Sequence, residues 1–109
     1  DVWKLPEEKE HQNMCLMDHF IALDRKKVKL TVAGNIRTGK DVKRVLTAGI
    51  DFVSIGRAAI LHHDFAKQVL TNANFTPQET PVTPDYLRDE GLGEKFITYM
   101  SRWDNFVKM

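Results

Sequence analysis

The chain has 109 residues, of which 42% are hydrophobic and 28% charged, and its 16 basic residues nearly balance its 15 acidic ones. This length suits one small domain, and the near-neutral charge gives no reason to expect a nucleic acid or a membrane surface as partner. The single cysteine, Cys15, cannot form a disulfide within the chain, which favours a reducing compartment and predicts a cytoplasmic protein.

The first half of the chain alternates between amphipathic and apolar segments. Clustered apolar residues predict a helix over residues 14–24, and a β-branched run predicts a strand over 28–33. Thr38 and Asp41 have the spacing of a capping box, which places the start of a helix over 40–48 there.

The alternation continues to residue 70. A second apolar strand is predicted over 52–55, then a short helical turn over 58–61 and a helix over 65–70. Because apolar strands that alternate with helices are typical of parallel sheets, the sequence predicts an α/β fold. We therefore expect residues 1–70 to form βα units with right-handed crossovers.

Residues 71–109 are predicted to be a linker followed by a helical tail. The stretch 71–82 is rich in turn-forming residues, and Thr83 with Pro84 predicts the start of a helix. A last helix is predicted over 94–103. Trp3 and Trp103 are expected to cover apolar surface.

Each of the two predicted strands runs into a glycine at its carboxyl end. Gly34 and Asn35 follow the first strand, and Gly56 and Arg57 follow the second. If the strands are parallel neighbours, the two turns lie on one rim, and each glycine lets a ligand approach the backbone. The start of each following helix favours an anion, and an arginine holds two phosphate oxygens at once. Gly34, Gly56 and Arg57, within AGNIRT and IGRAAI, are therefore predicted to form a phosphate site.

The segment LTVAGNIRTGKDVKRVLTAGIDFVSIGRAAI resembles the seventh and eighth βα units of the old yellow enzyme family of FMN-dependent NAD(P)H:flavin oxidoreductases. Residues 1–4 and the final GLGEKFITYMSRWDNFV resemble the same family, so the resemblance covers nearly the whole chain. The positions in register with the family's Gly-x-Asp-x-Val-x-x-Gly-Arg segment are Gly49, Asp51, Val53, Gly56 and Arg57.

This resemblance implies the carboxyl-terminal part of a (β/α)₈ TIM barrel in which Gly34, Asn35, Gly56 and Arg57 hold the FMN phosphate. NAD(P)H would be the reductant and a small molecule the acceptor. The resemblance places the catalytic side chains on earlier strands, so no catalytic residue is expected here and the chain alone should be inactive. The departures are Gly39, where proline is usual, and His63-Asp64, where Asp-Pro is common; the absence of cysteine after Arg57 disfavours the iron–sulfur branch.

Two alternatives remain open from the residues alone. The chain could belong to a phosphate-binding TIM barrel that acts on a phosphorylated substrate without flavin, or it could be an interaction module without a ligand. No metal site is predicted, because the four histidines show no ligand-like spacing with a carboxylate.

The sequence also predicts partners for its strands. Two parallel strands cannot close a barrel, and each apolar strand needs neighbours on both sides. The chain begins at Asp1 rather than methionine. We therefore expect a piece of a longer protein that lacks the earlier barrel strands, or a fragment that associates with copies of itself.

Overall fold

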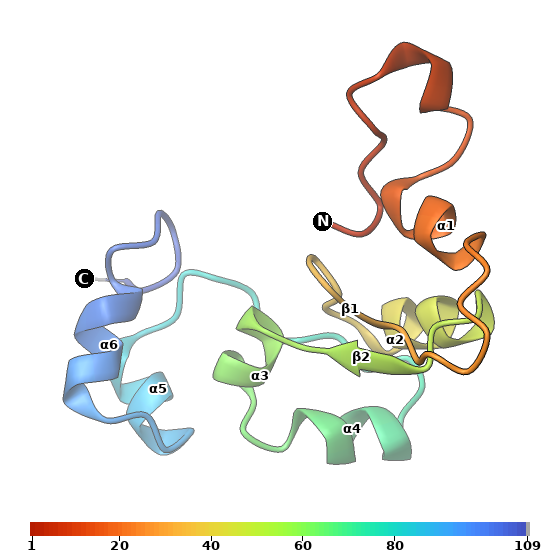
Figure 1. Ribbon diagram of the computed structural model, residues 1–109. Helices are drawn as coiled ribbons and strands as arrows, with labels where there is room; N and C mark the ends of the chain where they lie inside the picture. The colour runs from red at the N-terminus through yellow and green to blue at the C-terminus, as the bar shows by residue number, and fades with distance from the viewer. Residues whose placement is uncertain (109) are drawn as a thin grey trace.

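The computed structural model describes residues 1–108 and shows two strands and six α-helices in that range (Figure 1). Within these residues, no helix has the length and apolar character that crossing a membrane requires. In chain order the elements are a 3-10 turn at Lys9–His11, α1 (Leu16–Ile21), β1 (Thr31–Ala33), α2 (Gly39–Thr47), β2 (Phe52–Ser54), α3 (Arg57–Leu61), α4 (Phe65–Thr71), α5 (Pro84–Asp89) and α6 (Glu94–Met100).

The two strands are parallel neighbours, as the sequence predicts. Thr31 pairs with Phe52 and Ala33 pairs with Ser54. Each strand has only three residues. Before β1 the chain turns at Lys26 (φ 52°), and Val28 is 70% exposed. Among the described residues each strand has one partner, so the other edge of each is unpaired.

Helix α2 begins with the predicted capping box. Thr38 Oγ1 accepts a hydrogen bond from the Asp41 N–H at 3.0 Å, and Asp41 Oδ2 accepts one from the Thr38 N–H at 3.1 Å. The next residue, Gly39, is buried, and its N–H donates to Phe75 O at 2.8 Å. A Cβ at this position would lie 2.5 Å from Ala73 O. Proline has no N–H to donate and would not fit, so glycine has a local reason to stand here.

The buried apolar side chains form two separate clusters. The first lies between the amino-terminal segment, α1 and α2, and consists of Val2, Met17, Ile36, Val45 and Ile50. The second joins α3 to the tail and consists of Leu61, Val82, Leu87, Ile97, Met100, Phe106 and Val107. Leu61 lies before residue 71 but packs with the tail, so this cluster spans the expected boundary between 1–70 and 71–109. The division into these two parts stays a prediction.

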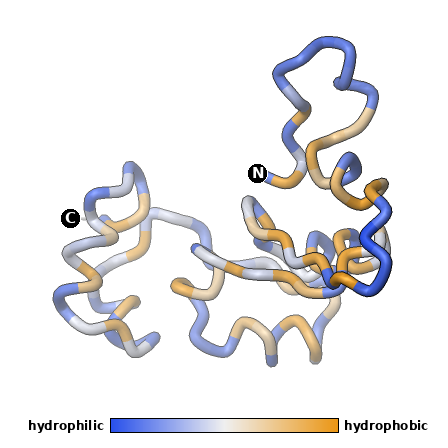
Figure 2. Tube along the Cα trace, in the orientation of Figure 1, coloured by the Kyte–Doolittle hydropathy of each residue, from blue (hydrophilic) through white to orange (hydrophobic). Residues whose placement is uncertain are grey.

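Much apolar surface around the strands is uncovered. Phe20, Leu23, Phe52 and Leu70 are 55%, 59%, 59% and 87% exposed, and Figure 2 shows hydrophobic stretches along the strand region. The radius of gyration is 16.2 Å, against about 13 Å for a compact domain of this size. The apolar face predicted over 14–24 therefore buries little, and α1 is shorter than that range.

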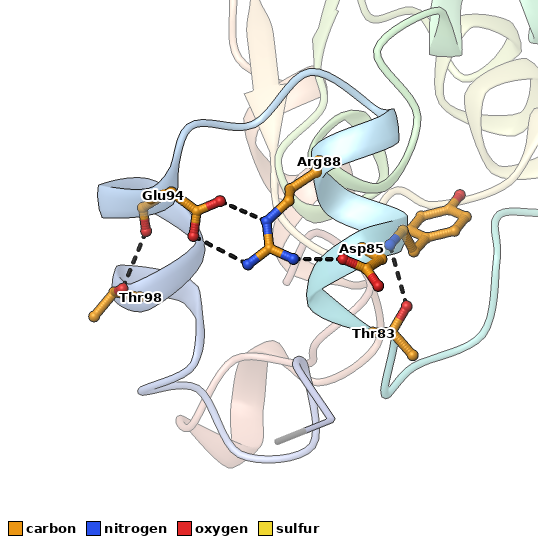
Figure 3. A network of polar contacts seen from close by, with 6 residues as sticks. Thr83, Asp85, Arg88, Glu94 and Thr98 are labelled. Atoms are coloured by element: carbon orange, nitrogen blue, oxygen red, sulfur yellow. Dashed lines mark hydrogen bonds and ion pairs between the residues drawn. The ribbon is translucent and has the colours of Figure 1, made fainter.

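The tail is more tightly organised. Thr83 Oγ1 accepts a hydrogen bond from the Tyr86 N–H at 3.1 Å, which confirms Thr83 as the cap of α5. Arg88 bridges α5 and α6 by bonding to Glu94 and Asp85 (Figure 3). The hydrogen bonds to Glu94, and to a smaller extent the hydrogen bond to Asp85, raise the pKa of Arg88. Helix α6 ends at Met100, three residues before the predicted end.

Candidate functional site

The four residues of the predicted phosphate site come together in the structure. Gly34 and Asn35 follow β1 directly, and Gly56 and Arg57 come shortly after β2. Because the two strands are parallel and in register, their carboxyl ends meet at one rim. Both turns line one cavity of about 660 Å³.

The first turn is fixed by the amino-terminal segment. The Val2 N–H donates to Gly34 O at 3.1 Å, and Asn35 Nδ2 donates to Asp1 Oδ2 at 3.2 Å. Gly34 has φ 125°, and a Cβ there would lie 2.7 Å from the Asp1 nitrogen. Glycine is therefore needed at position 34 for backbone conformation and packing. Asp1 occupies the space on the Cβ side of Gly34, while Gly34 also lines the cavity, so the approach of a ligand to its backbone stays a prediction.

The second turn is open. A Cβ at Gly56 would meet no atom within 4 Å, so its backbone can be approached from the cavity. Arg57 is exposed, and within residues 1–108 no carboxylate lies within ion-pair distance of its guanidinium. The second turn thus offers accessible backbone and an uncompensated positive charge at one point.

The helix starts contribute less than the sequence suggests. At α2 the first-turn region is filled by the chain's own acid, because Asp41 Oδ2 accepts from the N–H groups of both Arg37 and Thr38. A second anion there would meet the carboxylate charge. Helix α3 has only five residues, too few for a substantial dipole. The site therefore depends on the Gly56 backbone and on Arg57.

The opposite wall of the cavity comes from the tail. Residues 103–106, which follow α6, line the cavity that the two glycine turns line. The guanidinium carbon of Arg57 lies 5.2 Å from the centre of the Trp103 ring. This contact joins residues far apart in sequence, and no local spacing could have revealed it.

A second polar group that the sequence did not predict lies between α3 and α5. His63 Nδ1 is 2.6 Å from Glu90 Oε2, and the oxygens of Asp64 and Glu90 and the His63 nitrogen all lie within 4.8 Å of one another. Glu90 Oε2 also accepts from the His63 N–H at 2.9 Å. Such a set could hold a metal ion, but the hydrogen bonds already account for the arrangement.

The pKa values of this pair follow from the same contact. The hydrogen bond to Glu90 raises the pKa of His63 above its ordinary value. Burial acts to raise the pKa of Glu90, but the hydrogen bonds and charge of His63 outweigh it, so that pKa is lowered. The contact therefore favours a charged pair that ties the segment after α3 to the end of α5.

Residues 7–104 match the family model described as Histidine biosynthesis protein. The match includes both strands, both glycine turns and most of the tail. The family consists of enzymes with a TIM-barrel fold that act on phosphorylated substrates. No solved structure matches the chain.

This match overturns the resemblance to the old yellow enzyme family. The predictions of FMN as cofactor and of NAD(P)H as its reductant, which followed from that resemblance, are wrong as well, because the matching family does not use FMN. The physical reason for the error lies in the Gly56-Arg57 turn. A glycine and an arginine after a parallel strand suit a phosphate, whatever molecule carries it, so the turn does not specify flavin. The chain belongs to the histidine biosynthesis protein family.

Proposed function

We propose that the chain is part of a TIM-barrel enzyme without flavin, and that it binds the phosphate group of the enzyme's substrate at Gly34, Asn35, Gly56 and Arg57. The observation that carries the proposal is the cavity of about 660 Å³ that both glycine turns line. The family supports it, because its members act on phosphorylated substrates. This proposal is the first of the two alternatives left open by the sequence, a phosphate-binding TIM barrel that acts on a phosphorylated substrate without flavin.

Each part of the turn pair has a distinct role in this proposal. Arg57 supplies a permanent charge and a planar set of N–H donors that match two phosphate oxygens. The open backbone at Gly56 lets the phosphate come close to the main chain. Gly34 holds the shape of the first turn, and Asn35 (φ 59°) continues that turn along the rim of the cavity.

The proposal assigns binding and no chemical step to this chain. Its cavity is lined by Arg57, amides, backbone and the carboxylates of Asp1 and Asp104. The reaction would then be carried by the rest of the barrel. We expect the 109-residue chain by itself to be inactive.

The test is to measure binding of inorganic phosphate and glycerol 3-phosphate by calorimetry for the protein and for Arg57→Ala. Loss of a charge-assisted contact is worth about 1.5–3 kcal/mol, so we expect affinity to fall roughly ten- to a hundredfold. Arg57→Lys should restore only part of the phosphate affinity, because an ammonium lacks the planar pair of N–H donors that a guanidinium offers to two oxygens. Equal affinity in all three proteins would remove Arg57 from the site, and no binding by any would favour an interaction module without a ligand.

A glycine pair provides the matched control. Ala at position 56 or 93 would meet no atom within 4 Å, and neither glycine has a positive φ. Their backbones differ, because Gly93 is extended (φ -78°, ψ 156°) and Gly56 (φ -97°, ψ -97°) lies outside the regions that a residue with a Cβ prefers. Only Gly56 faces the cavity. Gly56→Ala should therefore weaken phosphate binding while Gly93→Ala leaves it unchanged, and the melting temperature of each variant separates a loss at the site from backbone strain. Equal binding in both would show that the phosphate does not approach the backbone at Gly56.

A further inference from the structure

Arg57 is held by an aromatic ring rather than by a carboxylate. Its guanidinium carbon lies 5.2 Å from the centre of the Trp103 ring, within the range of a cation–π contact. Such a contact uses the flat face of the guanidinium. The N–H donors point outward in the plane and stay free for a ligand.

Trp103 is itself held in a fixed loop. The Trp103 N–H donates to Met100 O at 3.1 Å, and the Phe106 N–H donates to Trp103 O at 3.2 Å. Phe106 is 4% exposed within the tail cluster. Its carbonyl accepts from the Val82 N–H at 3.0 Å, which anchors the loop to the strand-like segment at Val82. The loop thus presents Trp103 to Arg57 from a rigid support.

We propose that Trp103 is a positioning residue for the phosphate site. It orients the Arg57 guanidinium so that its N–H edge faces the cavity, and residues 103–106 form the tail's wall of that site. The inference rests on the proposed function, since it assigns Trp103 a role only in phosphate binding by Arg57. A carboxylate partner would also order Arg57, but it would cancel the charge that attracts the phosphate. An aromatic ring orders the side chain and leaves the charge available.

The chain offers a control with the same exposure. Phe96 and Trp103 are both 43% exposed, and Phe96 does not line the cavity. Phe96 stacks on Tyr99 of α6, whose ring in turn meets the Trp103 ring edge-on, so Phe96→Leu also tests whether a change passed on through Tyr99 affects binding. We would measure binding of glycerol 3-phosphate to the protein, Trp103→Leu, Trp103→Phe and Phe96→Leu. Trp103→Leu should bind about two- to fivefold more weakly, Trp103→Phe should recover most of the affinity, and Phe96→Leu should match the unmodified protein.

A spectroscopic signal separates this role from a merely structural one. In the unmodified protein without ligand, the ring current of Trp103 should displace the NMR signal of the Arg57 Nε–H group, and Trp103→Leu should abolish the displacement. An undisplaced signal would overturn the inference even if Trp103→Leu failed to fold. If Arg57→Ala loses phosphate while Trp103→Leu binds normally, the inference fails and the proposed function stands. If Arg57→Ala binds normally, the proposed function fails.

Discussion

The strand unit (residues 28–57) and the tail after residue 82 both have buried apolar side chains, such as Val45 and Leu87, but they differ in what they leave exposed along their main elements. In the tail, Leu87 is 0% exposed and Ile97 is 4% exposed. In the strand unit, Phe52 on β2 is 59% exposed and Val28 before β1 is 70% exposed. The tail packs into a small core that also includes Leu61 of α3, whereas the strands leave apolar surface and unpaired edges exposed.

This difference has a consequence for the proposed site, which lies where the two regions meet. The turns at Gly34 and Gly56 belong to the strand unit, and the wall with Trp103 belongs to the tail. The wall from the tail rests on this buried core, while the strand rim depends on how well the sheet is completed. Covering the sheet should therefore sharpen phosphate binding without any change in the tail.

The largest expected effect comes from comparing two leucines, one buried in the tail and one exposed outside it. Leu87 is fully buried and Leu70 is 87% exposed. Leu87→Ala removes buried methyl groups and leaves a cavity, so we expect the free energy of unfolding to fall by about 2–5 kcal/mol. Leu70→Ala should change it by less than about 0.5 kcal/mol. Denaturant titration of both variants measures this, and equal effects would contradict the contrast between the regions.

A second prediction addresses the uncovered region. We propose that the isolated chain associates with copies of itself through the open sheet edge, and Phe52→Lys should shift it toward the 12.6 kDa monomer, because a charge on an edge strand opposes pairing. Phe96→Lys, on the tail helix α6, should leave association unchanged. Sedimentation at micromolar concentration measures both. If the unmodified 109-residue chain is a monomer that melts cooperatively, the strands need no partner.

The features predicted correctly from sequence are those set by neighbouring residues. The capping box of Thr38 and Asp41 and the cap at Thr83 need only spacings of three residues. The parallel pairing of the strands follows from apolar runs separated by one helix. These signals are local, so one sequence is enough to read them.

The missed features depend on contacts across the fold or on the rest of the ligand. The stacking of Trp103 on Arg57 and the bond between His63 and Glu90 each join distant segments. The family was misassigned because the Gly56-Arg57 turn specifies a phosphate and carries no information on what the phosphate is attached to. The strands are shorter than the sequence predicts, with β1 at 31–33 against 28–33 and β2 at 52–54 against 52–55, and among the described residues each has one neighbour.

The smallest expected effect concerns the junction of the two regions, where His63 bonds to Glu90. The raised pKa of His63 means that its contribution to stability is complete below its ordinary value of 6.5 and is lost as pH rises through the raised value. The lowered pKa of Glu90 means that its contribution is complete above its ordinary value of 4.5 and is lost as pH falls through the lowered value. Both conditions hold together between pH 4.5 and 6.5.

The melting temperature should therefore show the pair most clearly in that window. Glu90→Gln keeps the size of the side chain and removes its charge, so subtracting its melting temperature from that of the unmodified protein isolates the contact. The charges of His62 and Asp64 also act on this pair, and both residues are present in both proteins. We expect a difference that is largest between pH 4.5 and 6.5 and shrinks on both sides. Since His63 is 66% exposed, solvent screens the pair and the difference should be small. A difference independent of pH would show that the two regions are joined by packing at Leu61 and not by this charged contact.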